Sequence, residues 1–155
     1  MEKIMKNYIK YALVFLILGI VCGIFYREFT KAYDLANEYT TLGLAHTHFF
    51  VLGVAFVIIF GLVTDKLNKH SDKIFRASFI TYSVGVMGAG IMIVVRGILD
   101  VLVKSENVVF QVSNGVSGAI SGISGMFHAV LGAGIILMFV AWLRKDKNAT
   151  VGGNA

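Results

Sequence analysis

Four long apolar stretches divide this chain, and each is long enough to cross a membrane. They run from about residue 11 to 26, 42 to 63, 77 to 103 and 118 to 143. A transmembrane helix needs about 20 apolar residues to cross about 30 Å of hydrocarbon. The first stretch is shorter, but Lys10 at its start can lay its aliphatic stem along apolar surface and keep its ammonium in water. The sequence therefore predicts an all-α fold, a polytopic membrane four-helix bundle.

Composition excludes the soluble classes of protein. Hydrophobic residues make up 57% of the 155 residues and charged residues 15%, against about 25% charged in an ordinary soluble domain. A soluble domain of this size cannot bury so much apolar surface. The single Cys22 excludes an internal disulfide. We expect one four-span domain over residues 1–147, followed by a disordered Gly- and Asn-rich tail over residues 148–155.

The distribution of Lys and Arg predicts the orientation of the spans. Ten of the 14 basic residues lie in the N-terminal flank, the connection between the second and third spans, and the C-terminal flank. Cytoplasmic segments of membrane proteins carry this excess, so both termini are expected in the cytoplasm. The basic residues are scattered over span ends and are not gathered on one element, so nucleic-acid binding is not expected.

A few ionisable side chains lie inside the predicted spans, where they are costly and usually functional. Counted from the outer end of each span, His48 and Arg96 lie about 10 Å deep and His128 about 15 Å deep. All therefore fall in the outer half of the bundle, which predicts a functional site at that depth. The complete set is His46, His48, Arg96, Asp100 and His128, with Arg27 and Glu28 at the outer end of the first span.

Helical spacing predicts which of these side chains share a face. His46 and His48 are about 200° apart on a helix, so only one of them can reach the bundle centre. Arg96 and Asp100 are four residues apart and can pair. In the fourth span, His128 lies on a stripe of small and polar residues, a pattern that also serves simple helix packing. That stripe contains Ser117, Ser121, Ser124, His128 and Gly132.

Haem is the cofactor that best suits this combination. Membrane b-type cytochromes hold iron through His side chains from two helices of a bundle. His48 and His128 are the preferred axial ligands, with His46 as the alternate or supporting residue. Arg96 and Arg27 lie on the outward side, where Arg would bind the propionates. No CxxCH motif is present, so the haem would be b-type and not covalently attached.

Two other interpretations stay open. His46, His48 and His128 could instead bind copper or zinc in a binding or transport protein, or the chain could be a purely structural membrane partner. No nucleotide or protease fingerprint is present, so the sequence favours a protein that is not an enzyme. If it catalyses a reaction, we expect a haem-dependent oxidoreductase. The haem interpretation implies electron transfer, haem handling or gas sensing, with a quinone or a redox protein as partner. The glycine-rich faces favour a dimer or trimer.

Several strings of residues resemble an uncharacterised family of small four-helix bacterial membrane proteins, a domain of unknown function. The resemblance covers residues 11–143 and implies a multi-pass protein of the bacterial cytoplasmic membrane. Arg27, His46, His48, Arg96 and His128 match its characteristic positions. The strings are FYREFT (25–30), AHTHFFVLG (45–53), VRGILDVL (95–102) and SGAISGISGMFHAVLGAGIIL (117–137).

A second, local resemblance concerns AHTHFFVLG alone. It is similar to histidine-bearing helices of the haem-copper oxidase catalytic subunit and of related haem proteins of nitric oxide metabolism. That subunit has about twelve spans, and this chain lacks the further histidines of its copper site. The resemblance implies haem ligation and not oxygen reduction.

Overall fold

The computed structural model describes residues 2–68, 73–106 and 109–144 of the chain. Within these ranges it contains helices and no strand. The elements are α1 (Glu2–Ala32), η1 (Thr41–Gly43), α2 (Leu44–His48), η2 (Phe49–Ala55), α3 (Phe56–Lys66), α4 (Lys73–Lys104) and α5 (Asn114–Leu143). The predicted tail over residues 148–155 lies outside the described residues.

Four rods are long and apolar enough to span a membrane, which confirms the predicted fold class. They are Met5–Ala32, Thr41–Lys66, Lys73–Lys104 and Asn114–Leu143. The second rod is continuous, because η1, α2, η2 and α3 follow one another without a loop. Each helix extends several residues beyond its predicted apolar stretch, since polar residues at the ends continue the backbone hydrogen bonding.

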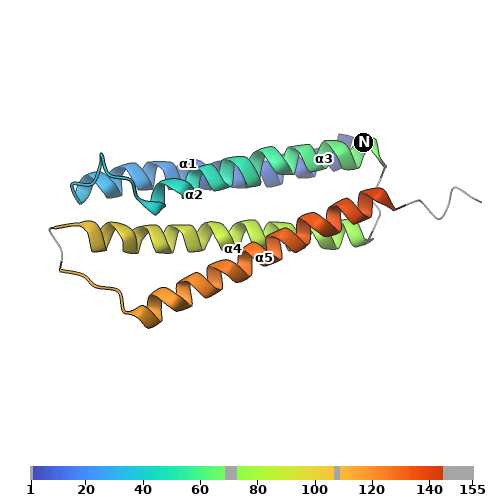
Figure 1. Ribbon diagram of the computed structural model, residues 1–155. Helices are drawn as coiled ribbons and strands as arrows, with labels where there is room; N and C mark the ends of the chain where they lie inside the picture. The colour runs from blue at the N-terminus through green and yellow to red at the C-terminus, as the bar shows by residue number, and fades with distance from the viewer. Residues whose placement is uncertain (1, 69–72, 107–108, 145–155) are drawn as a thin grey trace, which may run out of the picture.

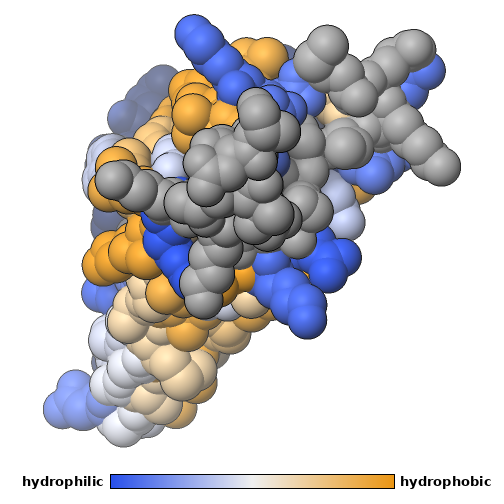
Figure 2. Space-filling view, turned by 90° about the vertical axis from the view of Figure 1, so that its right-hand side faces the viewer, coloured by the Kyte–Doolittle hydropathy of each residue, from blue (hydrophilic) through white to orange (hydrophobic). Residues whose placement is uncertain are grey.

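The helices form a bundle whose two ends differ. Figure 1 shows the start of α1 and the end of α5 at the same end, which we call the inner end, where α3 also stops and α4 begins. The outer end carries the connections that follow α1 and α4. Figure 2 looks onto the inner end and shows hydrophilic side chains gathered around it. α5 crosses α4 obliquely and moves away from the other helices toward the outer end (Figure 1).

Glycine allows α4 and α5 to meet backbone to backbone. A Cβ atom added at Gly85 would lie 2.5 Å from the Leu131 backbone, and one at Gly134 would lie 2.5 Å from the Tyr82 nitrogen. Small residues give membrane helices this close approach. Five other glycines of α5 face open space, because an added Cβ there would meet nothing within 4 Å. They are Gly115, Gly118, Gly122, Gly125 and Gly132.

The main apolar core fills the inner half and contains two buried polar anchors. The Trp142 Nε1–H donates to Thr64 Oγ1 at 3.0 Å, which joins α5 to α3. The Tyr82 hydroxyl donates to the Leu52 carbonyl at 2.6 Å, and the Tyr82 side chain is fully buried. Buried polar groups need such partners because hydrocarbon offers none.

The second span contains a π-helical segment, η2, that sequence periodicity did not predict. It begins at Phe49, directly after His48. Its wider turns disturb the ordinary hydrogen-bond ladder, and π segments in α-helices occur frequently at functional sites. The Leu52 carbonyl that accepts the Tyr82 hydroxyl lies in this segment. α4 therefore supplies a side chain that stabilises the irregular turn.

α1 ends in a left-handed turn that brings the chain back toward α4. Asp34 has a φ of 57°, and the Leu35 amide donates to the Thr30 carbonyl at 2.8 Å. This is the Schellman arrangement of a helix C-terminus. It buries Leu35 against Leu42 and Val101, which form a second, smaller core at the outer end.

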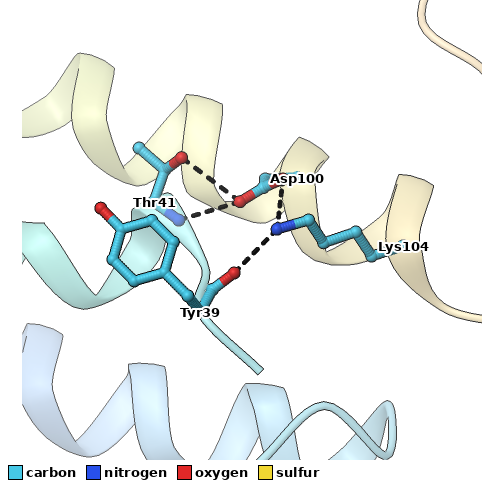
Figure 3. A network of polar contacts seen from close by, with 4 residues as sticks. All are labelled: Tyr39, Thr41, Asp100 and Lys104. Atoms are coloured by element: carbon cyan, nitrogen blue, oxygen red, sulfur yellow. Dashed lines mark hydrogen bonds and ion pairs between the residues drawn. The ribbon is translucent and has the colours of Figure 1, made fainter. Parts of the chain in front are cut away.

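A polar network fixes the outer connection to α4 (Figure 3). Asp100 Oδ2 accepts from the Thr41 amide at 2.9 Å and from Thr41 Oγ1 at 3.3 Å. Lys104 Nζ lies 3.3 Å from Asp100 Oδ1 and donates to the Tyr39 carbonyl at 2.7 Å. The carboxylate of Asp100 is thus paired with Lys104, one turn further along α4, and not with Arg96 as the spacing permitted.

Substituting Gly85 by Ala tests the α4–α5 crossing. The added methyl group would overlap the Leu131 backbone, so we expect the free energy of unfolding to fall by about 1–3 kcal/mol. The control is Gly118→Ala, where the methyl group meets nothing and the better helix propensity of Ala leaves stability unchanged or slightly raised. Denaturant titration in detergent, followed by circular dichroism, measures both. Equal stability of the two variants would contradict the crossing.

Substituting Asp100 by Ala tests the outer network. The Thr41 amide would lose its acceptor, so we expect a loss of about 1–3 kcal/mol and faster hydrogen exchange at Thr41. Glu106→Ala removes an exposed carboxylate at the same end and serves as the charge-matched control. The network has no such role if both variants exchange the Thr41 amide at the wild-type rate.

Candidate functional site

Two histidines from different helices meet in the outer half of the bundle. His48 is the last residue of α2, and His128 lies near the middle of α5. Their ring centroids are 6.4 Å apart and the ring planes are inclined at 68°. His48 is half-buried and His128 is exposed on the surface of the chain. The fold therefore brings these two predicted site residues together.

Each of the two rings is oriented by a backbone carbonyl. His48 Nε2 donates to the Val86 carbonyl of α4 at 3.0 Å, and His128 Nδ1 donates to the Ser124 carbonyl one turn earlier in α5 at 2.8 Å. A carbonyl can only accept a hydrogen bond. In the neutral rings the lone pair is therefore on His48 Nδ1 and His128 Nε2, which makes those nitrogens the ones able to bind a metal.

The face of α5 around His128 is small and open. Gly125 lies three residues before His128 and Gly132 four residues after it, so both share its face. Neither glycine has a neighbour within 4 Å of the Cβ position. The chain itself therefore leaves space beside His128 that a flat group could occupy.

His46 lies on another side of the same helix, against α1. Its ring stacks on Tyr26 with centroids 6.3 Å apart, and it faces Gly23 of α1, where an added Cβ would make an ordinary contact with His46 at 3.7 Å. The His46 Nδ1 atom is buried and has no hydrogen-bond partner in the described part of the chain. The structure thus separates His46 from the His48–His128 pair, as their angular spacing on a helix requires.

The two predicted arginines lie in different surroundings. Arg96 Nη1 donates to Ser121 Oγ of α5 at 3.1 Å. Ser121 is seven residues, or about 10 Å, outward from His128. Arg27 of α1 is exposed and its Nε lies 3.5 Å from Glu28 Oε1. The contacts of Arg27, with Glu28 and Thr30, do not reach the histidine pair.

A cavity of about 250 Å³ adjoins Arg96 at the outer end. It lies between η1, α4 and the start of α5, with Thr41, Asp100 and Ser117 as polar walls and Leu99 and Ile120 among the apolar ones. Asp100 is already paired with Lys104. Arg96 is therefore the cation in this wall that can bind a carboxylate group.

The donor set is small. Within residues 2–68, 73–106 and 109–144 no three His, Cys, Asp or Glu side chains gather closely enough to hold a metal ion. The site consequently offers two imidazole nitrogens and, further outward, one guanidinium group.

Sequence reasoning missed the groups that orient the histidines. The Ser124 carbonyl could have been found from helical spacing, because Ser124 lies four residues before His128 on the same face of the helix. The Val86 carbonyl could not have been found from the sequence, because every residue has a backbone carbonyl. Only the packing of α4 against α2 places this one beside His48. The stacking of Tyr26 on His46 likewise depends on the pairing of α1 with α2.

Comparison with known proteins gives a family and no activity. No curated protein and no solved structure matches the chain, so the local likeness of residues 45–53 to the haem-copper oxidase subunit gains no support. The sequence model of a family described as protein of unknown function, DUF2871, matches residues 5–145. This multi-pass membrane protein therefore belongs to the DUF2871 family.

Proposed function

We propose that the protein binds a b-type haem in the outer half of its bundle, with His48 and His128 as axial ligands. The observation that carries the proposal is the 6.4 Å between the two ring centroids. Bonds from a metal to imidazole nitrogen are about 2.0–2.1 Å long, so two rings on opposite sides of one metal have centroids about 6 Å apart. The separation therefore matches that of two imidazoles that share one metal.

The donor set favours haem over copper or zinc. A porphyrin supplies four ligands to its iron, so two histidines complete the coordination. Zinc sites use three or four protein ligands, and the described residues offer no such group. Haem, when bound, would supply one-electron chemistry and an iron centre that can bind small gases.

The residues around His128 fit a flat macrocycle. Gly125 and Gly132 leave open space on its face, and its free Nε2 is the nitrogen that commonly binds metals. His48 Nε2 is held by Val86, so His48 would bind the iron through its free Nδ1. The adjacent π segment η2 provides a turn whose hydrogen bonding can readjust.

Arg96 is the side chain proposed to bind the propionates. It meets α5 outward of His128 and lines the outer cavity with further N–H groups available. Arg binds carboxylates through two parallel hydrogen bonds. Arg27 would contribute less to propionate binding, because it lies on α1 and its side chain is next to Glu28.

The proposed role is electron transfer, haem handling or gas sensing in the cytoplasmic membrane of a bacterium, with both termini in the cytoplasm. Backbone carbonyls would orient the two imidazoles, and apolar side chains would exclude water from the inner half. A quinone or a redox protein would be the partner. Gly115, Gly118 and Gly122 of α5, where an added Cβ would meet nothing within 4 Å, support a homo-oligomer.

The visible absorption spectrum of the purified, haem-supplemented protein tests the proposal. We expect an intense Soret band and sharpened bands on reduction, as for iron with two imidazole ligands. His128→Ala should abolish the two-imidazole spectrum and lower haem affinity by at least about tenfold. His46→Ala is the matched control and should keep the spectrum, because His46 faces Tyr26.

Two results would overturn the haem proposal. One is the absence of a Soret band in the well-folded wild-type protein supplied with haem. The other is stoichiometric copper or zinc in elemental analysis of a haem-free preparation, which would select the metal-binding alternative.

The two arginines provide a second, independent test. Arg96→Gln should lower haem affinity roughly 10- to 100-fold, the range expected for loss of a charged hydrogen bond. Arg27→Gln should change it several-fold less, since Arg27 is exposed and lies on α1. Haem titration monitored at the Soret maximum measures both affinities. The assignment of Arg96 is wrong if the two variants bind haem equally well.

A further inference from the structure

A surface groove runs along α1 from the inner end toward the middle of the bundle. Its first and last hollows also border α4, and the last reaches Phe127 of α5. Three adjoining hollows of about 310, 360 and 440 Å³ compose it, and Tyr11 lines all three. The floor near the inner end is Phe79, whose ring packs edge-on against Tyr8 at 5.3 Å and Tyr11 at 5.4 Å between centroids. The backbones of α1 and α4 stay apart along this line.

The groove is cationic at one end and apolar along the rest. Arg76 and Asn7 line the innermost hollow, and Lys10 lines the next one. Both basic side chains are exposed, and neither forms an ion pair with any described carboxylate. The hollow nearest the middle of the bundle is almost wholly apolar, with Val14 and Ile91 among its walls. Among the described side chains, no Asp or Glu lines any of the three hollows.

The length of the groove matches one leaflet of a bilayer. Arg76 and Ile91 are 15 residues apart on α4, which corresponds to about 22 Å along the helix. Half of a bilayer, headgroup layer included, is about 20–22 Å thick. The basic residues therefore lie at headgroup depth and the apolar hollow at acyl-chain depth. Tyr8 and Tyr11 lie near the boundary, where tyrosine is enriched in membrane proteins.

We propose that this groove binds one anionic phospholipid, with the phosphate and headgroup on Lys10 and Arg76 and an acyl chain in the hollow beside Val14. Basic pockets between membrane helices recognise anionic headgroups in this way. A second copy of the chain fits less well, because a symmetric contact would bring the basic residues of both copies together. The apolar hollow reaches Phe127, the neighbour of His128, but the basic residues that bind the headgroup line the hollows nearest the inner end, so the site does not require the proposed haem.

Removing the two cations tests the headgroup end. The protein in detergent is titrated with palmitoyl-oleoyl phosphatidylglycerol or phosphatidylcholine, and native mass spectrometry counts the bound lipid. We expect the Lys10→Gln/Arg76→Gln variant to bind phosphatidylglycerol about 25-fold more weakly, roughly fivefold for each basic residue. Its binding of phosphatidylcholine should stay the same. Lys66→Gln removes an exposed cation at the same end outside the groove and should have no effect.

Filling the apolar hollow tests the acyl-chain end. Val14 and Ile17 are both on α1 and are 51% and 53% exposed, but Val14 lines the groove and Ile17 does not. Val14→Trp should weaken phosphatidylglycerol binding at least fivefold, whereas Ile17→Trp should leave it unchanged. All these side chains are exposed, so folding is expected to persist and is checked by circular dichroism.

Three results would overturn the lipid site. They are equal affinity of the wild-type protein for the two lipids, unchanged phosphatidylglycerol binding by the double variant, and a wild-type dimer that Val14→Trp converts to a monomer. The last result would assign the groove to a second copy of the chain. None of these readouts depends on haem content.

Discussion

The close crossing of α4 and α5 at Gly85 and Gly134 is the constraint on which the rest of the structure depends. Two helices that touch backbone to backbone at one point and cross at an angle must separate away from that point. The contact lies in the inner half, so α5 leaves the bundle at the outer half (Figure 1). That separation exposes His128 and its small neighbours, while the aromatic core around Tyr82 and Trp142 closes the inner half.

The π segment in the second span follows from the same packing. In a membrane every backbone carbonyl needs a partner from the protein, and the irregular turn after His48 obtains one from the Tyr82 hydroxyl. Because Tyr82 sits in the crossing beside Gly134, the position of α4 couples the irregular turn to the contact with α5. His48 is held by α4 as well, through the Val86 carbonyl. α4 thus helps to position the histidine pair, although neither histidine belongs to α4.

The two halves of the molecule offer different chemistry. The outer half combines two imidazoles, a guanidinium and an open face of α5, which together suit an oriented cofactor. The inner half offers a tight core and, on its surface, a groove with cations at one end. The haem proposal rests on histidines of α2 and α5 and the lipid proposal on basic residues of α1 and α4, so one can fail without the other.

The sequence by itself determined the four spans, their all-helical nature and the depth of the ionisable groups, because span length and hydropathy depend only on each segment and its solvent. Helical spacing also determined that His46 and His48 face different neighbours. Only the tertiary structure decided which neighbours those are, that Asp100 pairs with Lys104, that Arg96 reaches Ser121, and that a π turn follows His48. Periodicity reports the faces of one helix at a time, whereas these contacts depend on where and at what angle two helices cross.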